Sequence, residues 1–111
     1  MRTLSLLVVG ALLATSPQGV WASEQGGKVT RVAVGATPPS GFGVDGTRTA
    51  MPACATDGSW VIAPTSDDSS KEMFSAVLTA FATGKRITVV GTGNCSVLQP
   101  MREQVLYIVV E

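Results

Sequence analysis

The sequence predicts a small, mainly β domain with a single helix, in the order β-β-β-α-β-β. Three observations support this fold class. Short segments rich in β-branched residues alternate with turns that contain Gly, Pro or Asp-Gly. A single segment, residues 70–83, repeats apolar residues at helical spacing. Two cysteines, Cys54 and Cys95, flank that segment and can tie its neighbours together.

The N-terminal segment is typical of a secretory signal peptide. Arg2 supplies a positive charge, residues 4–14 are apolar, and Val20-Trp21-Ala22 offers small residues for cleavage before Ser23. About 11 apolar residues fall short of the roughly 20 that span a bilayer. We therefore expect residues 1–22 to be removed from an exported protein, periplasmic or secreted. Residues 23–111 would form one domain with no membrane span after cleavage.

Five segments are predicted to be strands, and turn residues separate them. The predicted strands are residues 28–35, 42–46, 59–63, 86–90 and 104–110. Residues 36–41 contain two prolines, which cannot donate to a β ladder. Gly91-Thr92-Gly93 is expected to form a turn at the end of the fourth strand. The fifth strand is apolar on both faces, so we expect it to be central or covered.

The helix is predicted over residues 70–83. Ser69 and Glu72 fit a capping box at its start, and Gly84 suits the left-handed residue that follows its end. Its predicted apolar face consists of Met73, Phe74, Val77, Leu78, Phe81 and Ala82.

This order, with the helix between the third and fourth strands, is that of a five-stranded oligonucleotide/oligosaccharide-binding (OB) barrel. An open α+β sheet with the helix on one face is the alternative, because order alone does not show closure. Pairing of the first strand with the fourth distinguishes the two architectures.

The two cysteines predict a disulfide, as is usual for an even cysteine count in a small exported protein. A Cys54–Cys95 bond closes a loop of about 41 residues around the predicted helix. In the loop-entropy model such a bond stabilises the domain by up to about 4 kcal/mol.

The composition argues against catalysis and against nucleic-acid binding. The chain has 8 Lys and Arg, 8 Asp and Glu and no His, so the commonest general base and metal ligand is missing. With both cysteines paired, no thiol nucleophile is left. Removal of Arg2 with the signal peptide brings the net charge to about −1, which is not the basic surface that nucleic acid requires. We expect no enzyme activity, no metal or other cofactor and no nucleic-acid partner.

Arg48 and Trp60 are the candidate ligand-binding residues. Trp60 begins the third strand and can stack on a sugar, although packing in the core is the favoured interpretation. Arg48 lies in the loop after Asp45-Gly46 and can contact an acidic sugar, although a solvated surface arginine is favoured.

Several motifs, taken in order, resemble a known family. They are Gly27-Lys28-Val29, Pro52-Ala53-Cys54-Ala55 before Trp60, Thr83-Gly84-Lys85, and Gly91-Thr92-Gly93-Asn94-Cys95 before the hydrophobic last strand. Together they resemble small exported bacterial proteins related to the binding subunit of subtilase cytotoxin, over nearly all of residues 23–111. The resemblance implies an OB-type barrel. It also implies homo-oligomers, since the toxin members form pentameric rings that bind sialylated host glycans.

The leading hypothesis is an exported, non-enzymatic binding module whose ligand is a glycan or another cell-envelope component. One alternative is a periplasmic structural or protein-interaction domain with no small ligand. A single-stranded nucleic-acid-binding protein is the less favoured alternative.

Overall fold

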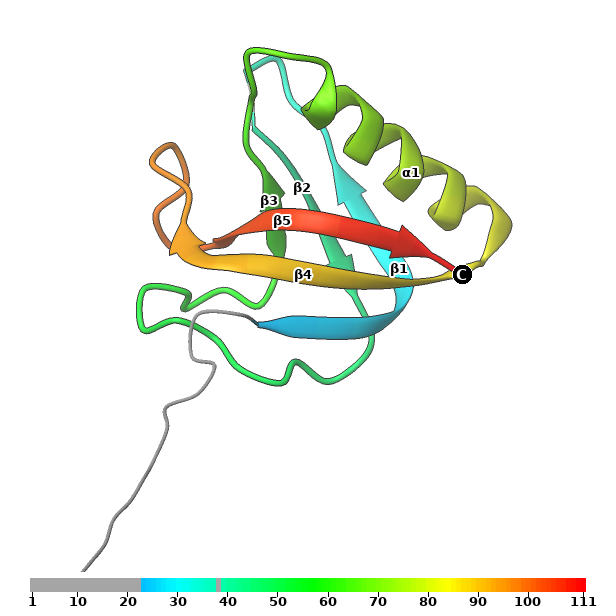
Figure 1. The fold of residues 1–111 in the computed structure, drawn as a ribbon, viewed down its shortest axis with the longest axis horizontal. Helices are drawn as coiled ribbons and strands as arrows, with labels where there is room; N and C mark the ends of the chain where they lie inside the picture. Colours follow the sequence, from blue (N-terminus) through cyan, green and yellow to red (C-terminus); the bar gives the residue numbers. More distant parts are fainter. Residues whose placement is uncertain (1–22, 38) are drawn as a thin grey trace, which may run out of the picture.

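The computed structural model describes residues 23–37 and 39–111, which form a sheet of five strands and one helix (Figure 1). The elements are β1 (Glu24–Ala33), β2 (Ser40–Val44), β3 (Trp60–Ile62), α1 (Ser69–Thr83), β4 (Arg86–Cys95) and β5 (Glu103–Val110). The predicted order is therefore confirmed. The predicted signal peptide, residues 1–22, lies outside the described residues.

The five strands close into a ring in the order β1-β2-β3-β5-β4. Adjacent strands are antiparallel, except that β3 and β5 are parallel. The long strand β1 serves two neighbours, pairing with β4 through Glu24–Lys28 and with β2 through Val29–Ala33. Figure 1 shows β1 bending between these two halves. The pairing of the first and fourth strands rules out the open sheet and gives the arrangement expected of an OB-type fold.

β1 begins earlier than predicted because it includes two glycines that a strand prediction disfavours. A Cβ atom on Gly27 would lie 2.5 Å from Asp45 Oδ1 and 2.7 Å from the Gly46 nitrogen. The missing side chain thus lets the turn after β2 pack against β1, where the Lys28 N–H donates to Asp45 Oδ1 at 2.9 Å. Val34, predicted to lie in the strand, follows its end and is exposed.

The helix has nearly the predicted bounds, but its start is stabilised by different residues. Ser69 is the first helical residue, and the N-cap residue Asp68 makes no side-chain capping bond. Asp67 Oδ1 accepts the Ser69 N–H at 2.9 Å, and Thr65 Oγ1 accepts the Ser70 N–H at 3.1 Å. The capping-box prediction is therefore wrong. At the other end Gly84 has φ 70° and is left-handed, as predicted.

The core lies between the inside of the ring and α1. Its buried members are Val29, Phe42, Trp60, Ile62, Val77, Ala80, Ile87, Val89 and Val105. Val77 and Ala80 are the buried residues of α1, and Met73 and Phe74 are partly buried against the core. Leu78 and Phe81 are 42% and 47% exposed, so the predicted apolar face of the helix is wider than the face that the sheet covers.

The last two strands differ from prediction at two points. Gly91-Thr92-Gly93 is not a terminal turn, because β4 continues through it to Cys95 with two register shifts against β5. Nor is β5 covered on both faces: Leu106, Tyr107, Val109 and Val110 are between 42% and 56% exposed. Among the described residues, no helix has the length and apolar character needed to cross a membrane.

Candidate functional site

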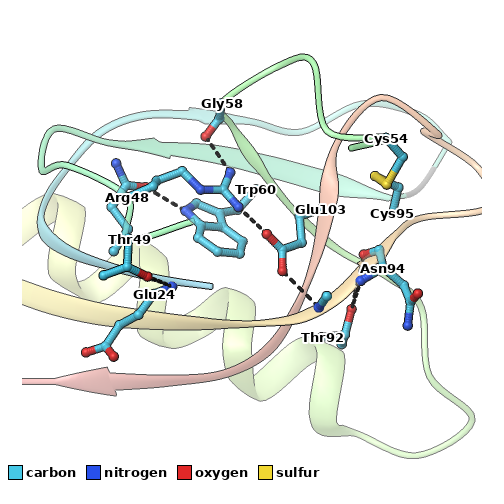
Figure 2. Close-up of polar contacts among 12 residues, drawn as sticks. Glu24, Arg48, Thr49, Cys54, Gly58, Trp60, Thr92, Asn94, Cys95 and Glu103 are labelled. Atoms are coloured by element: carbon cyan, nitrogen blue, oxygen red, sulfur yellow. Dashed lines mark hydrogen bonds and ion pairs between the residues drawn. A yellow bond between two sulfur atoms is a disulfide. The ribbon is translucent and has the colours of Figure 1, made fainter. Parts of the chain in front are cut away.

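The Arg48 side chain points into the ring of strands because its backbone pairs with β1. Gln25 and Arg48 form an antiparallel bridge, and Glu24 and Thr49 exchange two hydrogen bonds of 2.9 and 3.0 Å beside it (Figure 2). Residues directly opposite in an antiparallel pair share a face. Since the Gln25 side chain is buried inside the ring, Arg48 is directed to the same side.

Trp60 is completely buried where β3 enters the core. Its indole N–H donates to Gln25 Oε1 at 2.7 Å, and the Gln25 amide donates to the carbonyls of Val44 and Gly46. The indole ring packs in the core, and its N–H donates to a side chain of the same protein. The core interpretation of Trp60 is therefore confirmed, and the indole offers no free surface on which a sugar could stack.

Arg48, Trp60 and Glu103 form a buried cluster, and Figure 2 shows the three side chains turned toward one another. The Arg48 guanidinium carbon lies 3.8 Å from the Trp60 ring centroid, a cation–π contact. Arg48 Nη2 pairs with Glu103 Oε1, and Nη1 donates to the Gly58 carbonyl at 3.1 Å. The other Glu103 oxygen accepts the Gly93 N–H at 2.9 Å.

The charges of this cluster are almost wholly removed from water. The side chains of Arg48 and Glu103 are 7% and 0% exposed. Burial lowers the pKa of the Arg48 guanidinium from its usual value, while the Glu103 charge and hydrogen bond oppose that shift. Glu103 fits beside Trp60 only because Gly91 has no Cβ atom, whose position the Glu103 carboxylate overlaps. The expectation of a solvated Arg48 is wrong, and the cluster is structural.

The predicted disulfide joins Cys54, in the loop before β3, to Cys95 at the end of β4 (Figure 2). The two Cα atoms are 6.2 Å apart, within the range that a disulfide requires. Both cysteines are therefore occupied, and the bond fixes the loop that carries Asp57 to the start of the β4–β5 connection.

A different part of the surface offers a ligand space. A hollow of about 240 Å³ opens between the β1–β2 connection and the β4–β5 connection. It is lined by Ala33, Val34, Gly35, Thr37, Pro39, Gly41, Gln99 and Arg102. These two connections are the loops that bind oligosaccharides and oligonucleotides in OB folds.

Arg102 is the charged residue of this hollow, and its neighbours hold it in one orientation. Its Nε and Nη2 atoms contact Asp57 Oδ2 at 3.0 Å, and Nη1 donates to Gln99 Oε1 at 2.9 Å. The Ser59 backbone N–H, bound to Asp57 Oδ1 at 2.8 Å, lowers the pKa of Asp57, and Arg102 lowers it further. A guanidinium has five N–H donors, so two of those of Arg102 have no partner among the described residues.

The structure thus brings the two candidate residues, Arg48 and Trp60, together, but in the core. Sequence reasoning missed Arg102, Gln99 and the role of Glu103. Arg102 carried one usable signal, since it precedes the fifth strand in the connection that OB proteins use for binding. No feature of the sequence indicated the role of Glu103, because a charged residue next to a strand is normally exposed.

Among residues 23–37 and 39–111, no group of three or more His, Cys, Asp or Glu side chains is arranged to hold a metal ion. Comparison of the chain with protein-family models, with curated proteins and with solved structures gives no match.

Proposed function

We propose that this protein is an exported, non-catalytic binding module that holds a glycan or another polar cell-envelope component in the hollow beside Arg102. The observation that carries the proposal is the fixed orientation of Arg102 between Asp57 and Gln99. A guanidinium held in place loses little side-chain entropy on binding and can offer its two remaining donors to a carboxylate or hydroxyl oxygen. Thr37 and Gln99 add polar groups to the same wall.

The chemistry of the hollow suits binding better than turnover. Its one charged lining residue is an arginine, which stays protonated and cannot act as a general base. The Asp57 carboxylate, which contacts Arg102, is engaged by Arg102 and Ser59. Export is compatible with the disulfide and with the balanced charge, and that charge also favours a glycan over nucleic acid.

Glycan-array profiling of the purified protein, followed by calorimetry on the strongest hits, tests the proposal. We expect Arg102→Met to weaken binding by at least about tenfold, as for the loss of a charge-assisted hydrogen bond. Arg86→Met is the matched control, since Arg86 is exposed at the opposite end of β4. It should bind like the wild type.

Two results would overturn the proposal. Silence across sialylated, neutral and envelope-derived glycans would remove the ligand class. Unchanged affinity in both Arg102→Met and Gln99→Ala, each shown to be folded by circular dichroism, would remove the site.

A further inference from the structure

One edge of β5 has no strand beside it over most of its length. β4 pairs with β5 from Glu103 to Val110, whereas β3 reaches only Glu103 and Gln104 (Figure 1). From Val105 onward, no strand in the described part of the chain adds to this second edge. The open edge is therefore the segment 105–110.

The hydrogen-bonding pattern identifies the backbone groups that face outward. The Glu111 N–H donates to the Arg86 carbonyl at 2.9 Å. Because bonded and non-bonded pairs alternate along an antiparallel ladder, Val109 and Tyr107 also bond to β4, whereas Ile108 and Val110 point away from it. The bonds on the other side of β4 agree with this assignment. The Gly91 N–H donates to the Ser23 carbonyl on the β1 side of β4, so the β4 residues that alternate with Gly91 bond to β5.

The open edge lacks the charged residues and prolines that often prevent strand addition. Residues 104–110 contain no charged residue and no proline. Four of their side chains, Leu106, Tyr107, Val109 and Val110, are between 42% and 56% exposed. An edge that is apolar, uncharged and rich in β-branched residues is a template for pairing with another strand.

The helix leaves room beside this edge. A hollow of about 350 Å³ separates the first half of α1 from β5, with Met73 and Ala76 on one side and Leu106, Tyr107 and Ile108 on the other. α1 therefore borders the edge without satisfying the backbone groups of Ile108 and Val110, for which no partner occurs among the described residues.

We propose that the β5 edge of a second copy of this chain occupies this position, antiparallel to the first, about a two-fold axis near Val109. In that register Ile108 of each copy faces Val110 of the other, so the outward N–H and C=O groups of both residues find partners. The two Val109 side chains meet at the axis. The two Glu111 carboxylates lie on opposite sides of it, each across from an uncharged Tyr107, so like charges do not oppose one another.

An identical strand suits this edge better than a foreign peptide. The segment offers no charge that could select a charged partner, and its apolar, β-branched side chains match their own kind. A two-fold contact uses the same surface on both copies, so assembly stops at the dimer and covers both open edges.

Sedimentation equilibrium of the purified protein with a matched pair of variants tests the dimer. Val109→Lys places two like charges opposite one another at the two-fold axis, whereas Leu78→Lys places the same charge on the exposed face of α1. We expect a dimer for the wild type and for Leu78→Lys, and at least about tenfold weaker association for Val109→Lys. Should Val109→Lys fail to fold, Val110→Pro removes one outward N–H and leaves the β4 ladder intact.

Backbone amide exchange measured by NMR gives an independent result for individual residues. In the dimer the amides of Ile108 and Val110 exchange slowly, and dilution or Val109→Lys makes them fast. The amides of residues 107 and 109 stay slow throughout, because β4 protects them. A monomer, a stable ring of more than two copies, equal weakening by Leu78→Lys, or fast exchange at Ile108 at every concentration would each overturn the proposal.

Discussion

At the scale of single residues, the fold contains a buried ion pair that could not be predicted from the sequence. Burial of Trp60 is predictable, because a large aromatic residue opens a short apolar strand. The positions of Arg48 and Glu103 are not, since isolated charges are normally placed on the surface. Their burial follows from two facts of tertiary structure: the bridge between Arg48 and Gln25, and the space left by Gly91.

The Arg48–Glu103 pair should be expensive to break from one side only. We expect Glu103→Gln to lower the free energy of unfolding by about 3 kcal/mol, because it leaves the Arg48 charge buried and uncompensated. The double variant Arg48→Met/Glu103→Gln should be more stable than Glu103→Gln alone, because it contains no unpaired buried charge. Urea unfolding followed by tryptophan fluorescence measures both values.

An exposed pair provides the contrast for this measurement. Lys71 and Asp68 approach only to 4.0 Å with both side chains largely in water, so Asp68→Asn should leave the unfolding free energy nearly unchanged.

If the double variant Arg48→Met/Glu103→Gln proved less stable than Glu103→Gln, the attraction of Trp60 for the Arg48 cation would be the larger contribution, contrary to our expectation.

At the scale of elements, the prediction is correct for features that the local sequence determines and wrong for features that contacts with other elements determine. The bounds of α1 are nearly correct because Gly84 ends the helix by its own left-handed conformation. The exposure of Leu78 and Phe81 depends on how wide a surface the ring presents to the helix, which no local pattern encodes. The open edge of β5 likewise results from the shortness of β3, a partner distant in sequence.

The start of α1 allows a test of its observed capping. We expect Asp67→Ala to lower the melting temperature, because the Ser69 N–H then loses its acceptor. Ser69→Ala is the control and should melt like the wild type, since Ser69 is inside the helix and its side chain caps nothing. Thermal unfolding followed by circular dichroism compares the two.

The pH dependence of the same variants gives a second test. The Ser69 backbone N–H lowers the pKa of Asp67 below 3.8, so this contact stabilises the fold above that pH and is lost as the pH falls through the folded-state value. The difference in melting temperature between the wild type and Asp67→Ala should therefore shrink in acid. A lower melting temperature for Ser69→Ala, with none for Asp67→Ala at neutral pH, would instead support the capping box.

At the scale of the whole molecule, the closed ring places the two loops of the hollow side by side. The strand order predicts that these two loops lie close together, because β1 pairs with β2 and β4 pairs with β5 in the same closed ring. The identity of the hollow's charged residue does not follow from order, since it requires Asp57 to reach Arg102 from the loop before β3. The disulfide stabilises that loop, because Cys54 fixes it to the end of β4.

The disulfide should therefore contribute both to global stability and to the geometry of the hollow. We expect Cys54→Ser to lower the melting temperature markedly under oxidising conditions, with an upper limit of about 4 kcal/mol in unfolding free energy. Under strong reductant the wild type and the variant should melt together, because neither then has the bond. Separation of the two curves in reductant would mean that the serine destabilises by itself. Identical curves in oxidising buffer would show that the bond, although its geometry is satisfied, contributes nothing to stability.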